Sequence, residues 1–439
     1  MMTSRRAFLR EGGAGVLGAS VLERTGAAFG AGQSDETVVV GAIGCGGRGT
    51  AIAREFARLK GVEVAYVCDP DEARAGAAAT AIGQMGGTTP KVVTDLRRIL
   101  DDKSIDAVTV ATPDHWHAPA AILACDAGKH VYVEKPCSHN IREGQWLVEA
   151  ARRTGRVVQH GTQSRSSGHV AHAIAQLHEG IIGDVLVAKA INVQRRKDIG
   201  HAAPGEPPAG FDYDLWLGPA PTVPFQANRH HYDWHWWYAF GTGDMGNDGV
   251  HDLDIARWGL GVDTHPTTIA AVGGKYYFDD DQQFPDTQYV LFEYPGDGKV
   301  GKRRQLVFEQ RIWSTYEPEG FQNGNLFYGT EGWMILSKNG LVKVFDAKNV
   351  PRPLPGEPPK MMGHQEDFVD AIRNGRPPTA EIGIGFISAT LCHLGNIATR
   401  VGRTLRFDPA NERIVGDDEA ASLARRSYRE GHWAIPKGA

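Results

Sequence analysis

The stretch TVVVGAIGCGGRG occupies residues 37–49. Its apolar opening is typical of a strand that is covered on both faces, and a helical pattern over residues 50–59 follows it. Between the two, Gly44, Gly46 and Gly49 form a G-x-G-x-x-G motif. The first glycine of such a motif permits a tight turn, the second lets the backbone approach a pyrophosphate, and the third allows close helix–strand packing. The stretch therefore predicts a dinucleotide-binding turn with the anion at a helix N-terminus.

A second strand is expected over residues 62–68, and Asp69 follows it, about 20 residues beyond the last glycine. An acidic side chain at this place accepts hydrogen bonds from the adenosine ribose hydroxyls and repels a 2′-phosphate. The sequence therefore predicts NAD as cofactor in preference to NADP. The alternative is that Asp69 is an ordinary turn residue at a strand end.

The alternation of strands and helices continues to residue 160. Strands are expected over residues 107–111, 130–133 and 157–160, and helices up to Gly128 and over residues 142–154. Such alternation predicts a parallel sheet, with ligands at the carboxyl ends of its strands. We therefore assign cofactor binding to the turn residues and to side chains at these ends: Gly44, Gly46, Gly47, Arg48, Gly49, Asp69, Thr112, Pro113, His117, Glu134 and Lys135.

The N-terminus resembles a targeting signal. Residues 4–10 read SRRAFLR, and a weakly apolar run over residues 12–22 follows, too short to span a bilayer. Basic residues, a short apolar region and then small residues are typical of a secretory signal, and the arginine pair before Phe-Leu resembles the twin-arginine class. We expect residues 1–32 to be this signal and the protein to be periplasmic or otherwise exported after folding. A frayed basic N-terminus is the alternative.

Composition agrees with a soluble protein that folds before export. The chain of 439 residues has 47 Lys+Arg and 52 Asp+Glu, a net charge of -5, which argues against nucleic acid as a partner. Its five cysteines do not form an even, spaced disulfide framework. We expect unpaired, mostly buried thiols, and no membrane insertion once the signal is removed.

The second half of the chain predicts a different kind of sheet. Strand-like segments are separated by Gly, Pro and Asp, and several alternate polar with apolar residues, as half-buried antiparallel strands do. They cover residues 267–272, 287–294, 304–311, 325–328, 332–337 and 341–345. A Pro-rich connector over residues 350–359 and helices over residues 364–374 and 384–399 follow, and we expect the tail from Arg413 to lie over a neighbour. The predicted domains are residues 37–160 and 161–439.

Three motifs follow the G-x-G-x-x-G motif in order: TPDHWH at residues 112–117, EKP at residues 134–136, and a Gly-rich segment with His251 and Asp254. This order resembles the glucose–fructose oxidoreductase / inositol dehydrogenase (Gfo/Idh/MocA) family. The resemblance implies a Rossmann domain, then an α/β domain with a large open, mostly antiparallel sheet for substrate binding and oligomer contacts. It also implies a homo-oligomer that oxidises or reduces a carbohydrate or polyol carbon with a nicotinamide cofactor.

The resemblance also implies roles for single residues. Lys135 matches the family's signature lysine, which contacts the reacting hydroxyl, and the bond before Pro136 is expected to be cis. His251 matches the catalytic histidine. Many members have an aspartate four residues earlier, where this chain has Asn247, and Asp248 stands three residues earlier. Because both spacings place a side chain near His251 on a helix, which of the two orients the imidazole stays open.

The ordinary pKa values of histidine and lysine suggest which of His251 and Lys135 is the acid/base. Histidine titrates at about 6.5 and lysine at about 10.4, so we expect His251 to be the acid/base and Lys135 to position the hydroxyl. The alternatives are a solvated turn lysine at residue 135 and a hydrogen-bonded core histidine at residue 251. Asp254 either assists His251 or bonds along the helix face.

A stretch dense in aromatic residues and histidine, residues 211–240, suits sugar faces and their hydroxyls. Core packing or an oligomer contact is the alternative for part of it. The expected substrate contacts are Lys135, Gln163, Arg165, Trp236, Asn247 and His251. His230, His231, Asp233 and His235 lack the spacing of a recognised metal motif, so we expect no metal site.

Three functions stay open on this evidence. The first is an exported NAD-dependent oxidoreductase acting on a sugar, polyol or glycoside hydroxyl. Since free nicotinamide cofactor is not expected outside the cytoplasm, such an exported enzyme would hold its cofactor tightly. The second is a redox-neutral glycoside hydrolase, lyase or epimerase that oxidises the sugar transiently. The third is a sugar-binding protein without turnover.

Overall fold

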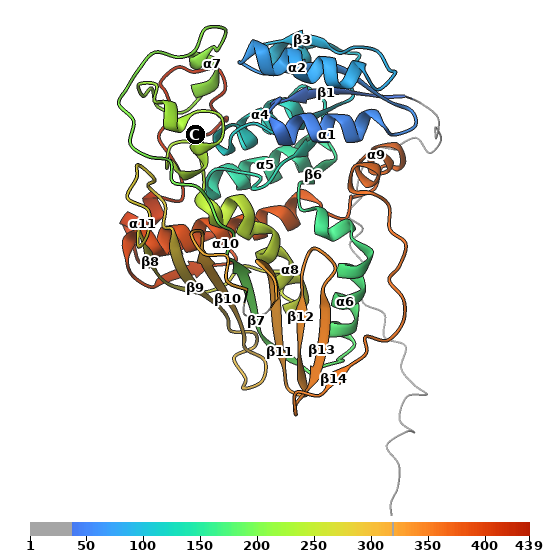
Figure 1. Cartoon of the computed structure of the whole chain (residues 1–439), viewed down its shortest axis with the longest axis vertical. Coiled ribbons are helices and arrows are strands. Elements are labelled where there is room, and N and C mark those ends of the chain that lie inside the picture. The colour runs from blue at the N-terminus through green and yellow to red at the C-terminus, as the bar shows by residue number, and fades with distance from the viewer. Residues whose placement is uncertain (1–36, 318–319) are drawn as a thin grey trace, which may run out of the picture. The chain divides into compact units, whose positions relative to one another are not determined.

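The computed structural model describes residues 37–317 and 320–439 (Figure 1). The predicted twin-arginine signal, residues 1–32, lies outside the described residues. Over the described residues the chain forms two sheets, one of six strands and one of ten.

The first sheet is parallel throughout, as the alternation of strands and helices predicts, and its strand order is β3-β2-β1-β4-β5-β6. Its strands are β1 (Val38–Ile43), β2 (Val62–Cys68), β3 (Lys91–Val93), β4 (Ala107–Val110), β5 (His130–Val133) and β6 (Val158–His160). The helices between them are α1 (Gly47–Ala57), α2 (Glu72–Gly83), α3 (Arg97–Asp101), α4 (Asp114–Asp126) and α5 (Ile141–Thr154). The strand order reverses between β1 and β4, and ligands of such sheets bind at the crevice that this reversal leaves.

The second sheet is antiparallel except for one pair, and its order is β14-β13-β12-β11-β7-β10-β9-β8-β15-β16. The strands are β7 (Val185–Asn192), β8 (Thr268–Gly274), β9 (Thr287–Tyr294), β10 (Arg304–Arg311), β11 (Asn323–Gly329), β12 (Gly332–Leu336), β13 (Val342–Asp346), β14 (Pro351–Arg352), β15 (Leu405–Asp408) and β16 (Arg413–Val415). The predicted fold class, a Rossmann sheet followed by a large, mostly antiparallel sheet, is confirmed. Strand β7 lies in the middle of the sheet and pairs in parallel with β10, although the sequence analysis did not predict it.

Two helices cover one face of the second sheet: α8 (Val250–Leu260) packs on β7 and β11, and α10 (Ile382–Val401) packs on β8 and on α5 (Figure 1). The length and mean hydropathy of α10 alone would suit a membrane span, but 72% of that span is buried inside the protein. Gly395 of α10 leaves room for the Met245 side chain, because a Cβ there would lie 2.4 Å from Met245 Cε. The short π-helical turn Met245–Gly249 is thus held between α10 and the sheet.

The remaining helices complete the two layers. They are α6 (Gly168–His178), α7 (Tyr213–Leu217), α9 (His364–Asn374) and α11 (Asp418–Ser422), with 3-10 turns at Gln163–Ser166, Ala227–Arg229 and Asp233–Trp236. Helix α9 returns to the first sheet, where Phe368 packs edge to face on Phe56 of α1, with ring centroids 5.8 Å apart.

The C-terminal tail packs on its own chain, and the expectation that it lies over a neighbour stays a prediction. Arg426 Nε and the Tyr428 hydroxyl both donate to Glu143 Oε1 of α5 at 2.7 Å. The Trp433 ring lies 5.7 Å from that of Trp116. A buried carboxylate held by two donors explains why the tail returns to the first domain. All five cysteines are buried and unpaired, as predicted.

Candidate active site

The glycine turn between β1 and α1 has two positions, Gly44 and Gly49, at which only glycine fits. Gly44 has a φ of +89°, and a Cβ there would lie 2.5 Å from the carbonyl oxygen of Ala111. A Cβ on Gly49 would lie 1.9 Å from the carbonyl oxygen of Gly44. Helix α1 begins at Gly47 with Gly46 as N-cap, and no side chain caps it. The first N–H groups of α1 are therefore left for a bound anion, as a pyrophosphate requires.

Asp69 lies beside this turn at the end of β2. Its carboxylate is 8% exposed and accepts hydrogen bonds from the backbone N–H of Cys45 at 2.7 Å and of Asp71 at 3.0 Å. Burial raises the pKa of Asp69, and the two backbone donors oppose that shift. The nearby Thr112 hydroxyl is buried and has no partner among the described residues. Asp69 and Thr112 thus offer polar atoms to a ribose or an amide that binds in the crevice.

A cavity of about 600 Å³ extends from the glycine turn to His251. It is lined by every predicted cofactor residue and by most of the predicted catalytic and substrate residues: Gly44, Gly46, Gly47, Arg48, Gly49, Asp69, Thr112, Pro113, His117, Glu134, Lys135, Gln163, Asn247, Asp248 and His251. Side chains from both sheets therefore meet in one cavity.

Lys135 follows β5, and the Lys135–Pro136 peptide bond is cis, as the resemblance implies. Its Nζ donates to Asn247 Oδ1 at 3.1 Å and to the Asn247 backbone carbonyl. Asn247 in turn donates through Nδ2 to Asp244 Oδ1 at 3.0 Å. Asn247 therefore fixes the ammonium group that the resemblance places next to the reacting hydroxyl.

Glu134 links the two ends of the cavity. Its carboxylate accepts from Arg48 Nε at 3.0 Å and from Gln163 Nε2 at 3.2 Å. Burial alone would raise its pKa, but Arg48 and Lys135 hold the pKa of Glu134 at about 2. The carboxylate is therefore ionised at all ordinary pH values and serves to hold Arg48 over the glycine turn.

His117 lies between two loops at the carboxyl ends of β4 and β5. Its Nδ1 lies 2.6 Å from the Pro136 carbonyl oxygen and its Nε2 lies 2.8 Å from that of Thr112. Since both ring nitrogens are used by the chain, His117 holds the two loops together at the cavity wall.

His251 is the second residue of α8, which follows the π-helical turn directly. Among the described residues neither Asn247 nor Asp248 hydrogen-bonds to its imidazole: Asn247 binds Lys135, and Asp248 accepts from Arg196 at 2.8 Å and Lys338 at 3.1 Å. A π-helical turn has more residues per turn than an α-helix, so the expected i–3 and i–4 relation to His251 fails. The role left for Asp248 is electrostatic, because its charge raises the pKa of His251.

The imidazole of His251 is neutral in this environment. Burial lowers the pKa of His251 to about 3, and Lys338 and Lys135 add to the shift, while Asp248 and Glu134 oppose it. A neutral imidazole in a cavity has a lone pair that can accept a proton.

Two cations that pair with Asp248 were not predicted from the sequence. Arg196 follows the unpredicted strand β7 and donates to Asp244 and Asp248. Lys338 follows β12, and its Nζ also lies 3.9 Å from a carboxylate oxygen of the buried Asp252. Each of the two follows the carboxyl end of a strand, and this position was the signal in the sequence that could have pointed to them. The place of Arg196 in the site depends on the pairing of β7, which was not predicted.

The family comparison identifies both halves of the chain. A model described as an oxidoreductase family NAD-binding Rossmann fold matches residues 38–162, and one described as that family's C-terminal alpha/beta domain matches residues 197–303 and 338–435. The chain belongs to the Gfo/Idh/MocA oxidoreductase family. Its Rossmann domain is of the NAD-binding kind.

Curated relatives match over part of their length. Glycosyl hydrolase family 109 protein 1 of a Shewanella species is 33% identical over 177 residues, which is 38% of each chain. Alpha-N-acetylgalactosaminidase of Shewanella oneidensis is 32% identical over the same length and shares. The match thus spans less than half the length of these relatives.

Solved structures of similar fold match over most of the chain. Aldose-aldose oxidoreductase from Caulobacter crescentus, complexed with glycerol, has a TM-score of 0.65 at 20% identity and covers 85% of this chain and 100% of that one. Levoglucosan dehydrogenase, in complex with NADH and levoglucosan, has a TM-score of 0.64 at 20% identity, with 84% and 99% covered. At this identity the likeness establishes the fold.

Two predicted substrate contacts do not reach the cavity of this Gfo/Idh/MocA chain. Arg165 is 8% exposed and forms a bidentate pair with Asp254, with Nε at 2.8 Å and NH2 at 2.9 Å. Trp236 is 1% exposed and packs with Phe278 and Phe284. The pairing of Arg165 also shows that Asp254 does not hydrogen-bond to His251; it accepts from Arg165 and from Ser388 at 2.6 Å.

The aromatic stretch divides between the two functions expected for it. Some of its side chains line the cavity: Trp216, His231, Tyr232, Trp234 and His235. Others are buried behind the cavity wall, where they pack on Trp216 and Trp234: Phe211, Phe225, Trp237 and Phe240. Tyr232 and Trp234 thus replace Trp236 as the aromatic wall of the cavity.

Asp69→Asn is expected to weaken NAD binding about tenfold to a hundredfold, because a charged acceptor is lost beside the glycine turn. The preference for NAD over NADP should fall at the same time, since the carboxylate no longer repels a 2′-phosphate. Titration calorimetry on cofactor-free protein measures both. Asp95→Asn is the matched control, because Asp95 lines the same cavity but is paired with Arg97; an equal loss in the control would contradict the role of Asp69.

Arg165→Met is expected to lower the free energy of unfolding by about 3 kcal/mol, because the buried Asp254 loses its bidentate partner and keeps only the longer ion pair with Arg257, at 3.6 Å. Urea unfolding measures this loss. Arg97→Met, which breaks the largely exposed pair with Asp95, should cost at most about 1 kcal/mol. If Arg165→Met instead weakened sugar binding at unchanged stability, Arg165 would be a substrate contact after all.

Proposed function

We propose that this protein is an exported NAD-dependent oxidoreductase that acts on a hydroxyl of a sugar, polyol or glycoside and keeps its NAD bound. The observation that carries the proposal is the single cavity that joins the glycine turn to Lys135, Asn247 and His251. Aromatic side chains line the same cavity, as sugar faces require. The names of the relatives and structural neighbours, which act on aldoses, levoglucosan or glycosides, support a carbohydrate substrate.

The residues divide the reaction as follows. The glycine turn and Asp69 would hold NAD, which would supply hydride transfer, the redox chemistry that side chains do not supply. His251, neutral at pH 7, takes the hydroxyl proton of the substrate as the carbon is oxidised. Lys135 donates a hydrogen bond to the same oxygen and stabilises its negative charge as the proton leaves. Asn247 holds the Lys135 ammonium group in place for this contact.

Export and cofactor retention belong together in this proposal. A twin-arginine signal serves proteins that fold in the cytoplasm, and the five buried thiols are consistent with folding there. Because the exported protein meets no free cofactor, NAD is restored within each cycle by a second sugar. Denaturing the purified protein should release about one NAD(H) per chain, and protein without any released cofactor contradicts the proposal.

The second candidate is a redox-neutral glycoside hydrolase, lyase or epimerase. The observation in its favour is the match to glycosyl hydrolase family 109 and to an alpha-N-acetylgalactosaminidase. Transient oxidation of one sugar carbon acidifies the neighbouring C–H, which a neutral base can then deprotonate. Product formation from a glycoside without net change in NADH distinguishes this candidate from the first.

A homo-oligomer is part of the proposal. Strand β9 alternates buried with exposed residues, and its exposed positions include Tyr289 and Leu291. Val272 of the adjacent β8 is 71% exposed. An apolar sheet face of this kind suits a second copy of the chain.

Leu291→Asp is expected to dissociate the oligomer, because it introduces a charge into that face. Light scattering of the purified protein measures the mass. Val300→Asp is the control, since Val300 is fully exposed in the loop between β9 and β10; a wild-type monomer contradicts the prediction.

A further inference from the structure

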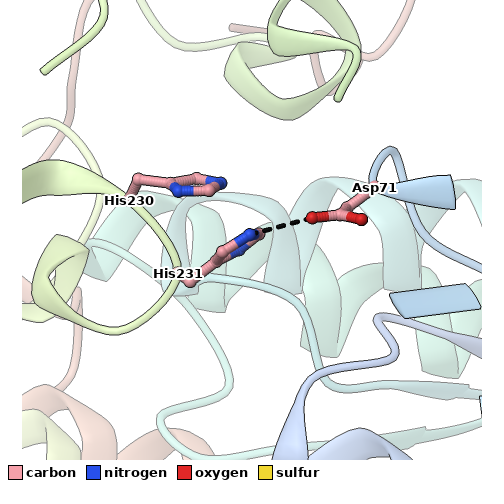
Figure 2. A group of neighbouring side chains, drawn as sticks. All are labelled: Asp71, His230 and His231. Atoms are coloured by element: carbon pink, nitrogen blue, oxygen red, sulfur yellow. Dashed lines mark ion pairs between the residues drawn. The ribbon is translucent and has the colours of Figure 1, made fainter. Parts of the chain in front are cut away.

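Three potential metal ligands meet at the boundary between the two domains (Figure 2). Asp71 lies in the loop after β2, and His230 and His231 lie in the aromatic stretch. One ligand atom from each side chain lies within 4.8 Å of the other two. Figure 2 shows the two imidazole rings one above the other beside the Asp71 carboxylate; the ring centroids are 3.2 Å apart.

The backbone holds these side chains in place. Asp71 pairs with Phe211 in an isolated antiparallel bridge, and the Asp212 N–H donates to the Pro70 carbonyl oxygen at 2.8 Å. His231 has a φ of +56°, which is uncommon for a residue other than glycine. Trp234 Nε1 donates to the His231 carbonyl oxygen at 3.1 Å and fixes that conformation. The cluster is thus built on two segments that are already joined.

The free atoms of the cluster are those that a cation needs. Asp71 uses Oδ1 to cap α2, by accepting from the N–H groups of Ala73 and Arg74, and this leaves Oδ2 to lie 2.9 Å from His231 Nε2. His230 Nε2 is buried and has no hydrogen-bond partner among the described residues. The His231 side chain is 28% exposed, so the cluster can be reached from solvent.

Both imidazoles are partly buried. Burial lowers the pKa of His230 to about 4, and His231 and Arg74 add to that shift. Burial likewise lowers the pKa of His231 to about 4, with a further contribution from Arg74.

We propose that Asp71, His230 and His231 bind one divalent cation of the zinc class, through the carboxylate and one nitrogen of each imidazole. Two imidazoles and one carboxylate suit zinc, cobalt or nickel better than magnesium. A tetrahedral zinc holds nitrogen ligands at about 2.0–2.1 Å, which places its donors about 3.3 Å apart. The stacked rings must therefore turn apart and the three donors draw closer, with water in the fourth position.

The metal links the β2–α2 loop to the aromatic stretch at the ribose end of the cavity. His231 and Arg74 line that cavity next to Asp69. A cation there opposes separation of the two segments and so slows the release of bound NAD. This consequence rests on the proposed function, whereas metal binding itself does not.

Sequence spacing gave no sign of this site, because one ligand comes from the first domain. Asp233 and His235, which stand beside the two histidines in sequence, do not belong to the cluster. His235 Nδ1 lies 2.6 Å from the Tyr232 carbonyl oxygen instead.

Equilibrium dialysis of the full chain, purified without a histidine tag and stripped with EDTA, tests the site with Zn²⁺ alone and with Co²⁺ alone. We expect about one ion per chain and the visible absorption of tetrahedral Co²⁺. His230→Gln and Asp71→Asn should each weaken binding about a hundredfold. His231→Asn should do the same and tolerate the left-handed backbone, since asparagine adopts it readily.

His201→Gln is the matched control, because it removes a histidine from another His–Asp pair, the exposed contact with Asp281. Circular dichroism verifies that each variant is folded. A wild-type chain that binds no zinc overturns the proposal, as does zinc that remains in both His230→Gln and Asp71→Asn.

The dissociation of NAD, measured with and without Zn²⁺, tests the consequence separately. We expect release at least about fivefold slower with the metal, the lower end of the usual coupling between two bound ligands. Zinc binding by a chain that carries no NAD would leave the metal site standing and overturn the proposed function. Retained NAD in a chain that binds no zinc would overturn the metal site and leave the proposed function standing.

Discussion

Lys135→Met is expected to lower kcat for the sugar reaction about a thousandfold while the protein still holds NAD. Methionine keeps the length of the side chain but removes the ammonium group that donates to Asn247 and that we place on the substrate oxygen. The negative charge that develops on that oxygen then has no partner. Steady-state kinetics with the best sugar, and the NAD content of the denatured variant, measure the two parts.

The control for Lys135 is Lys197→Met, which alters an exposed lysine just beyond β7. It should leave kcat unchanged. Normal turnover of Lys135→Met would contradict the assignment, and so would loss of NAD together with turnover, because Lys135 would then serve the cofactor alone.

His251→Asn is expected to lower kcat about a hundredfold to a thousandfold, since asparagine cannot accept the hydroxyl proton. The pH dependence of kcat/KM in the wild-type protein provides a second test of His251 as the base. With the pKa of His251 lowered to about 3, the imidazole is neutral at pH 5, so kcat/KM should not fall through the ordinary histidine range near pH 6.5. A pH profile of kcat/KM from about pH 5 to 8 measures this.

Lys338→Met tests the cause of that shift. Removing this positive charge should raise the pKa of His251 and move the acid limb of the profile to higher pH, without removing any atom that touches substrate. An unchanged profile would show that Lys338 does not act on His251. Loss of turnover at every pH would show that Lys338 has another task in the cavity.

Local sequence patterns determined the first domain almost completely. The apolar run, the glycine motif and Asp69 recur in the structure at the expected places, because each depends on contacts within one βαβ unit. The same applies to Lys135 and Glu134, which directly follow a strand whose end faces the crevice. His251 was placed by the resemblance rather than by a local pattern.

Other features depend on contacts that no local pattern encodes. Strand β7 lies between β10 and β11, which come more than a hundred residues later, and without it Arg196 has no place in the site. Arg165 and Trp236 have the chemistry of substrate contacts, but both are buried away from the cavity. Arg165 forms an ion pair with Asp254, and Trp236 packs in an aromatic cluster. The π-helical turn before α8 overturned the expected helical spacing between Asp248 and His251.

The absorbance of reduced nicotinamide in the purified protein, followed as sugars are added without free cofactor, tests the central claim most directly. We predict that a first sugar reduces the bound NAD, that the reduced form persists, and that a second sugar restores NAD within the same protein. Lys135→Met should hold the cofactor and show no change on either addition. Protein that contains no NAD, or bound NAD that no sugar reduces in the wild-type chain, would contradict the account.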